Sequence, residues 1–127
     1  MAIEFISPDN VHKPPTYSHV VKAGNTLYLA GQTALDVDGN LVGPGDVVAQ
    51  AEQVFKNLRD VLEAVGSSLA DIVKINTYLT DPASVPLIRE VRRGFFPGPQ
   101  PAATLVVISQ LARPEFMVEV EAVAVTD

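Results

Sequence analysis

Cysteine is missing from this sequence of 127 residues, and aromatic residues make up only 6% of it. The absence of cysteine excludes disulfides, thiolate nucleophiles and cysteine metal ligands. No apolar run approaches the roughly 18 residues of a membrane span, and the first residues lack the basic and apolar regions of a signal peptide. We therefore expect no membrane partner and a cytoplasmic location.

Basic residues are also few, with nine Lys and Arg against fifteen Asp and Glu, which gives a net charge of −6. Proteins bind nucleic-acid backbones through Lys and Arg surfaces that displace counterions. The composition therefore predicts no nucleic-acid partner. The one local cluster, Arg89, Arg92 and Arg93 in "REVRRGF", has the pattern of a solvated helix face.

What the chain does contain is a continuous α/β pattern without an internal repeat, so residues 1–127 are predicted to form one domain. Apolar residues at helical spacing predict a helix over 47–65, with Asp46 as its N-cap and Gly66 just beyond its end. A second helix is expected over 81–96. Strands are predicted near residues 2–6, on both sides of a turn at 23–25, over 71–81 and 102–109, and from 118 onward.

The predicted order is β-β-β-α-β-α-β-β, an α/β (α+β) arrangement in which two helices cover one face of a single mixed sheet. Apolar residues expected on the other face, such as Val106, Val120 and Ala122, would then need a partner. Glu119 and Glu121 lie two apart in the last strand and therefore face the same side. The sequence leaves open which of the two faces a site.

Motifs of the common catalytic and nucleotide-binding sites are absent: the chain has no GxGxxG, no Walker loop, no HExxH and no GxSxG elbow. The two histidines, His12 and His19, have no acidic or cysteine partner at metal-ligand spacing, so no metal site is expected. His19 falls in a predicted strand, where an ordinary, partly exposed histidine is expected. These motifs alone predict an α/β domain and no particular activity.

Three longer stretches carry a resemblance: "TYSHVVKAGNTLYLAGQTALDVDGNLVG", "AQAEQVFKNLRDVLEAVGSSLADIVKINTYLTD" and "PEFMVEVEAVAV". From about residue 15 to the end, the chain resembles the reactive intermediate deaminase (Rid) family. The resemblance implies a chorismate-mutase-like fold and a homotrimer with small-molecule clefts between its subunits. Active members of the family hydrolyse enamines and imines to keto acids and ammonia, with no metal and no bound cofactor.

The resemblance also implies a site. Tyr17 matches a tyrosine that lines the cleft, and Gly31 matches a glycine whose backbone meets the ligand. Glu119 matches a glutamate of the last strand that holds the attacking water. Glu119 is therefore the predicted catalytic residue.

Four further positions depart from the polar residues of the family. The arginine that binds the substrate's carboxylate falls on Ala103, and the serine before the glycine falls on Ala30. A small cysteine or threonine falls on Leu105, and an asparagine of the second helix falls on Arg89, which is either a replacement cation or an ordinary surface residue. The pocket is thus predicted to be more apolar than that of its relatives. The predicted substrate-binding residues are Tyr17, Ala30, Gly31, Arg89, Ala103 and Leu105.

Two functions follow from this reasoning. The first is a hydrolase or deaminase that acts on a small enamine, imine or related C–N compound. Its activity on 2-imino acids should be weak or absent, because Ala103 cannot bind their carboxylate as an arginine would. The alternative is a catalytically silent trimer that binds a small metabolite. The negative net charge disfavours a ribonuclease role.

Overall fold

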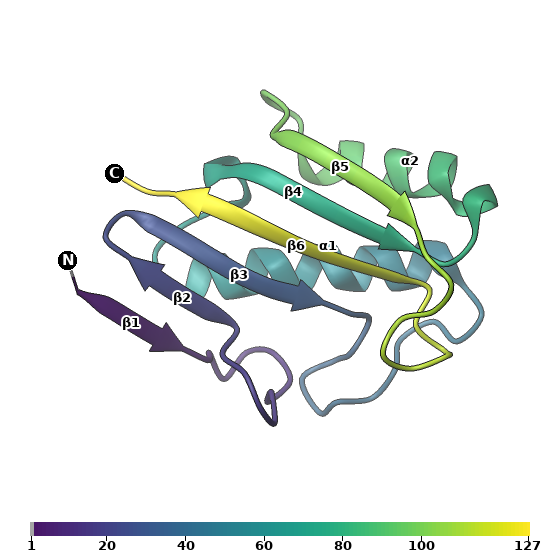
Figure 1. The fold of residues 1–127 in the computed structure, drawn as a ribbon, viewed down its shortest axis with the longest axis horizontal. Coiled ribbons are helices and arrows are strands. Elements are labelled where there is room, and N and C mark those ends of the chain that lie inside the picture. The colour runs from purple at the N-terminus through teal and green to yellow at the C-terminus, as the bar shows by residue number, and fades with distance from the viewer. Residues whose placement is uncertain (1) are drawn as a thin grey trace.

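The protein, described here from a computed structural model that covers residues 2–127, is built on one six-stranded mixed sheet with two helices packed against it (Figure 1). The strands lie in the order β1-β2-β3-β6-β4-β5. Strands β4 and β5 are parallel, and every other neighbouring pair is antiparallel. The elements are β1 (Ile3–Ile6), β2 (Val20–Ala23), β3 (Thr26–Gln32), α1 (Val47–Ala64), β4 (Ile72–Leu79), α2 (Val85–Phe95), β5 (Ala102–Val107) and β6 (Val118–Val125), with short 3-10 turns at Leu69–Asp71 and Pro82–Ser84.

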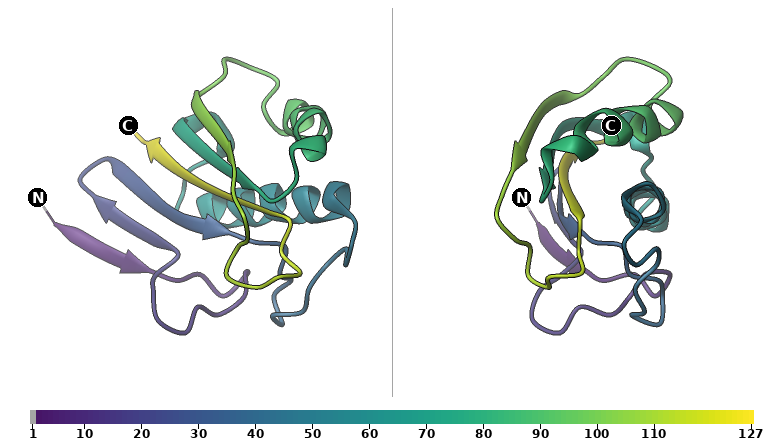
Figure 2. Two further views of the ribbon diagram at one scale, coloured as in Figure 1. Left: turned by 45° about the vertical axis from the view of Figure 1, so that its right-hand side comes forward. Right: turned by 90° about the vertical axis from the view of Figure 1, so that its right-hand side faces the viewer.

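The predicted element order and fold class are therefore confirmed. The last strand along the chain, β6, inserts between β3 and β4 and so lies at the centre of the sheet. Both helices lie on one side of the curved sheet, as Figure 2 shows from two directions. The opposite side, which we call the open face, carries none of the helices found in residues 2–127.

Helix α1 forms because its apolar residues recur at helical spacing and face the sheet. Val54, Phe55 and Leu58 are fully buried along this stripe. The carboxylate of Asp46 accepts a hydrogen bond from the backbone N–H of Ala49 at 3.1 Å, which confirms the predicted N-cap. Gly66 follows the helix with a φ of 79°, a conformation that favours glycine.

The faces of the sheet differ from the prediction in one respect. Val120 and Ala122 are buried opposite Thr77 and Ile75, on the face covered by the helices, so their predicted place on the open face is wrong. Val106 does lie on the open face and is exposed. The reason is the alternation of side chains along β6. Glu119 and every second residue after it turn toward the open face, and the residues between them turn into the core.

No helix within residues 2–127 is both long enough and apolar enough to cross a bilayer.

Candidate functional site

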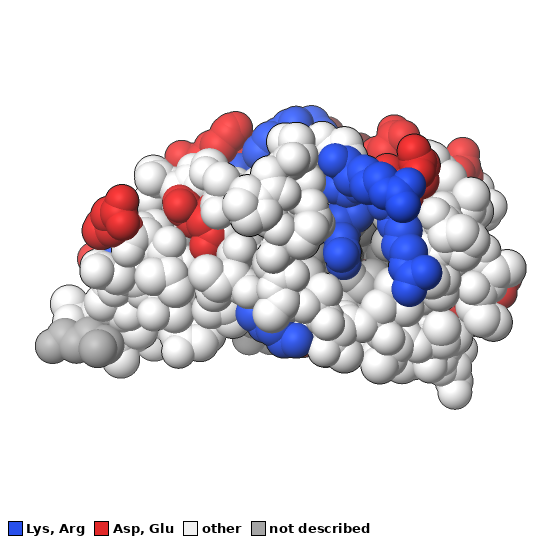
Figure 3. Space-filling view, turned by 90° about the horizontal axis from the view of Figure 1, so that it is seen from above, with Lys and Arg blue, Asp and Glu red and all other residues white. Residues whose placement is uncertain are grey.

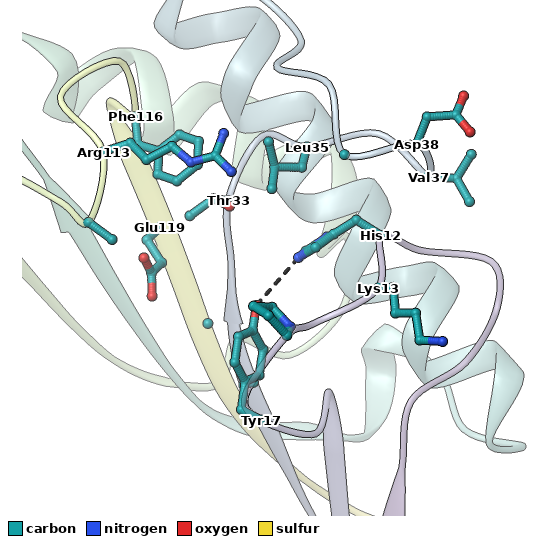
Figure 4. A pocket seen from close by; sticks show the side chains of 15 residues that line it. His12, Lys13, Tyr17, Thr33, Leu35, Val37, Asp38, Arg113, Phe116 and Glu119 are labelled. Carbon is teal, nitrogen blue, oxygen red and sulfur yellow. Dashed lines mark hydrogen bonds between the residues drawn. The ribbon is translucent and has the colours of Figure 1, made fainter.

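An open pocket of about 750 Å³ lies where three segments meet: the chain before β2, the end of β3 with its following loop, and the loop that leads into β6 (Figure 4). Four of the predicted site residues line it together. Its walls are formed by His12, Lys13, Pro15, Tyr17, Ala30, Gly31, Thr33, Leu35, Val37, Asp38, Gly39, Ala112, Arg113, Phe116 and Glu119.

A β-bulge sets the geometry at the base of this pocket. Leu29 pairs with Ala122 and Gln32 pairs with Val120, so that two residues of β3 oppose one residue of β6. The bulge turns the buried side chain of Gln32 toward the core and leaves Gly31 beneath Glu119. Bulges recur next to functional sites because they redirect side chains in this way.

Gly31 allows the carboxylate of Glu119 to lie directly against the backbone of β3. A Cβ atom built on Gly31 would overlap a carboxylate oxygen of Glu119. Any side chain at this position would therefore displace the carboxylate from its place in the pocket. Close backbone approach is one of the few reasons for a glycine within a strand.

Glu119 is the carboxylate that faces the pocket, and Glu121 is held elsewhere. Glu121 accepts hydrogen bonds from the hydroxyl of Tyr78 and from the amide of Asn76 on the open face. Glu119 makes no hydrogen bond or ion pair with the residues that the structure describes. Burial, and to a smaller extent the charge of Glu121, raises the pKa of Glu119 above its usual value of 4.5.

Tyr17 and His12 form the wall opposite Glu119. The hydroxyl of Tyr17 lies 3.4 Å from Nε2 of His12, a long hydrogen bond. Burial, and then the charge of Glu119, raises the pKa of Tyr17, which keeps it a phenol. Burial lowers the pKa of His12, and the charges of His19 and Arg113 lower it further, so that His12 is neutral above its usual pKa of 6.5.

His19 anchors this wall from below. It is fully buried, so the expectation of a partly exposed histidine is wrong. Its Nε2 donates to the backbone carbonyl of His12 at 2.7 Å, and its Nδ1 accepts from the side-chain amide of Gln32 at 2.9 Å. These two hydrogen bonds explain the burial, because both ring nitrogens find a partner inside the protein.

Two buried amides of α1 hold the other walls. Gln50 donates to the backbone carbonyl of Glu115 at 3.1 Å and accepts from the N–H of Met117 at 2.9 Å, which fixes the loop before β6. Asn57 donates to the carbonyls of Thr33 and Leu35 and fixes the loop after β3. Sequence reasoning missed both residues, although two amides seven apart on an apolar helix stripe were a signal that could have found them.

Comparison with known proteins identifies the family. Residues 10–126 match the family model described as Endoribonuclease L-PSP. The chain is 35% identical to the 2-iminobutanoate/2-iminopropanoate deaminase of Dermatophagoides farinae, over 87% of this chain and 86% of that protein. It is 32% identical to the 3-aminoacrylate deaminase RutC of Acinetobacter baylyi, over 98% of each chain. A crystal structure of RidA from the Antarctic bacterium Psychrobacter sp. matches with a TM-score of 0.91 and 36% identity, covering 97% of this chain and 99% of that one.

The chain belongs to the Rid family.

The remaining predicted residues of this Rid protein do not reach the pocket of their own chain. Ala103 and Leu105 lie on β5, the strand at the far edge of the sheet, and pair with Ile75 and Thr77. They therefore turn toward the face that carries the helices, and Arg89 is exposed on α2 on that same face. The predicted site thus falls into two groups at separate places in one chain.

The pocket of this Rid protein is also less apolar than the sequence predicted at its rim. Arg113, Lys13 and His12 also line it, and none of these three is among the predicted site residues. Among residues 2–127, no group of three or more His, Cys, Asp or Glu side chains could hold a metal ion.

Basic side chains gather in one region of the surface seen in Figure 3, on the side of the molecule where α2 lies. α2 carries Arg89, Arg92 and Arg93, and Arg93 forms an ion pair with Glu90 at 2.7 Å. This arginine cluster is separate from the pocket, because the residues that line the pocket include none from α2.

Proposed function

We propose that this Rid protein is a hydrolase that deaminates a small enamine or imine, and that Glu119 is its catalytic residue. The observation that carries the proposal is the half-buried carboxylate of Glu119, which lies over Gly31 without a partner and with a raised pKa in an open pocket. A carboxyl group that titrates closer to neutrality suits general acid and base catalysis. Some relatives bear the names of imine and enamine deaminases.

The chemistry needs one carboxylate that first accepts and then returns a proton. An enamine first tautomerises to the imine, gaining a proton on carbon and losing one from nitrogen. Ionised Glu119 accepts a proton from water as the water oxygen bonds to the C=N carbon. The proton then passes to the nitrogen and gives a carbinolamine. A second transfer moves the proton of the new hydroxyl to the nitrogen as the C=O bond forms, so that the C–N bond breaks and ammonia leaves a carbonyl product. Tyr17, a phenol in the same pocket, can donate a hydrogen bond to the bound substrate.

The working site is proposed to lie between subunits of a homotrimer. Three of the predicted residues do not line the pocket of their own chain, because β5 and α2 lie away from it: Ala103, Leu105 and Arg89. A neighbouring copy that places its β5 edge and α2 beside this pocket would bring both groups into one cleft. This arrangement is the one that the predicted site residues require.

A coupled assay tests the proposal. An amino-acid-oxidising or lyase enzyme generates a panel of imines and enamines in place, semicarbazide traps the residual imine, and released carbonyl product and ammonia are measured. We expect the protein to accelerate hydrolysis of at least one member of the panel. No acceleration across the panel would contradict it.

A catalytically silent binding protein is the second candidate function. The observation that favours it is the absence of polar side chains at Ala30, Ala103 and Leu105, because such positions offer a ligand only apolar contact. Saturable binding of a carbonyl compound without any acceleration of hydrolysis would support this function over the first.

A further inference from the structure

We propose that Arg113 determines substrate specificity by binding an anionic group that lies at the opposite end of the ligand from the carbon attacked at Glu119. The preferred ligand would then be an elongated anion, such as an enamine or imine whose carboxylate is separated from the C–N carbon by two or more carbons. This inference rests on the proposed function for its reaction, but its recognition step can be tested by binding alone.

Arg113 is held in place by the surrounding structure. Its guanidinium lies over the ring of Phe116, with 5.2 Å between Cζ and the ring centroid. Phe116 is itself buried, and Gln50 fixes the backbone on both sides of it through Glu115 and Met117. Stacking on an aromatic ring supported in this way orders a guanidinium before any ligand arrives.

The charge of Arg113 is available to a ligand. The only carboxylate of residues 2–127 within ion-pair distance is that of Glu115, at 3.9 Å, and both side chains are about half exposed. A contact of that length in water contributes little. The guanidinium therefore keeps donors that a bound carboxylate can take up in a forked arrangement.

Arg113 and Glu119 lie in the same pocket but do not pair with each other. Figure 4 shows the guanidinium of Arg113 directed toward Leu35, while the carboxylate of Glu119 points away from it. The Glu119 carboxylate lies over Gly31 instead. A ligand that contacts both must extend from one to the other, and a pocket of about 750 Å³ has room for such a molecule.

A 2-imino acid does not meet this requirement, because its carboxylate is bonded directly to the carbon that water attacks. The position that carries the carboxylate-binding arginine in the family is Ala103 in this chain, which has no charge to offer. The positions of Arg113 and Ala103 thus point to the same class of ligand: one that carries its negative charge away from the reacting carbon.

Two isomeric oxo acids provide a direct test. 2-Oxopentanoate and 4-oxopentanoate have the same formula and charge and differ only in the distance from carbonyl to carboxylate. We would titrate each into the full-length protein in its solution assembly, by calorimetry and by NMR with the Gly31 amide as a reporter of the pocket. The wild type should bind 4-oxopentanoate several-fold more tightly than 2-oxopentanoate. Arg113→Gln should weaken binding of 4-oxopentanoate about tenfold and leave 2-oxopentanoate nearly unchanged.

Matched variants separate this role from general charge effects. Arg113→Lys keeps the charge and should restore part of the lost affinity, whereas Arg93→Gln removes an exposed, paired arginine of α2 and should change neither affinity. Equal binding of the two isomers, a preference for 2-oxopentanoate, or no binding of either would overturn the inference. So would a loss of preference in Lys13→Gln but not in Arg113→Gln. Isomer selectivity without any turnover would instead contradict the proposed hydrolase and leave the role of Arg113 intact.

Discussion

At the scale of single residues, the pocket depends on how Gly31 and Glu119 fit together. The carboxylate can lie against β3 only because Gly31 has no side chain. Alanine at this position would push the carboxylate outward, into water, and the burial that raises the pKa of Glu119 would be reduced. The bulge in β3 and Gly31 within it therefore influence the pKa of Glu119, which lies on the neighbouring strand β6.

Glu119→Gln should abolish turnover with little effect on the fold. The amide cannot accept a proton from water, and loss of a general base costs about 10²–10⁴-fold in rate. Because the folded-state pKa of Glu119 is raised, its contribution to stability is full below pH 4.5 and is lost as the pH rises through the folded pKa. The variant should thus melt at the same or a higher temperature at neutral pH. Full activity in the variant would show that Glu119 is not the base.

The pH dependence of kcat/KM should also report the raised pKa of Glu119. Glu119 must be ionised to act as a base, so activity should fall as the pH drops through a pKa that lies above the usual 4.5. His12 acts on stability in the opposite direction to Glu119, because its folded pKa is lowered: its contribution is full above the usual pKa of 6.5 and is lost as the pH falls through the folded pKa. A stopped-flow pH series on both activity and unfolding would separate the two. An acid limb at or below 4.5 would be evidence against the proposed base.

Ala103→Arg should raise activity on 2-imino acids. A forked, charge-assisted contact to the substrate carboxylate is worth about 2–4 kcal/mol, or roughly 30- to 1000-fold in rate. Ala103 is exposed, so an arginine has room there. Ala103→Met is the matched control, since it adds a long side chain at the same position without a charge. The wild type clearing 2-aminoacrylate as fast as the variant would contradict the argument.

At the scale of secondary-structure elements, α1 does more than fill the core. Its buried amides, Gln50 and Asn57, lie on the stripe that faces the sheet and reach the two loops that wall the pocket. One helix therefore sets the distance between the loop after β3 and the loop before β6. The pocket should respond to changes in this helix although no residue of α1 lines it.

Gln50→Met should test this connection. The substitution removes three hydrogen bonds and leaves the carbonyls of Gly43 and Glu115 and the N–H of Met117 without their partner. We expect the free energy of unfolding in urea to fall by about 2–4 kcal/mol. Ligand affinity should also fall, because the loop that carries Arg113 loses its anchor.

Glu52→Gln, on the exposed side of the same helix, is the control and should change neither quantity. Unchanged ligand affinity in Gln50→Met, with the expected loss of stability, would show that the loop keeps its position without Gln50.

Elements with strong periodicity could be predicted from the sequence, and local irregularities could not. The stripe of α1 and its cap at Asp46 emerged directly from spacing and side-chain chemistry. The bulge at Ala30 and Gly31 did not, because an extra residue in one strand leaves the alternation of the other strand unchanged. The walls of the pocket were missed for a related reason: Arg113 and His12 lie in loops, where no period relates sequence to direction.

At the scale of the whole molecule, the open face explains why one chain should not be the working unit. Phe5 and Tyr28 are 73% and 52% exposed on this face, and Val106 and Val125 are exposed there as well. Apolar side chains grouped on an uncovered sheet face indicate a protein–protein contact. From the resemblance to Rid proteins we expect three copies, and we expect them to contact one another through the open face.

Light scattering at micromolar concentration should therefore find three chain masses. Val106→Glu should shift the population toward monomers, since it places a charge on the open face. Ala64→Glu places a charge at an exposed position at the end of α1, away from that face, and should leave the trimer intact. A monomeric wild type would contradict both the assembly and the shared cleft.

The central place of β6 has a consequence for synthesis. Of the six strands, β6 is the last to leave the ribosome, yet β3 and β4 have no partner on their inner edges until it arrives. A nascent chain halted before residue 118 would expose two strand edges that can pair with other chains. The sheet can therefore be completed only after β6 has been translated. Truncated products of this protein should be found in aggregates or bound to chaperones.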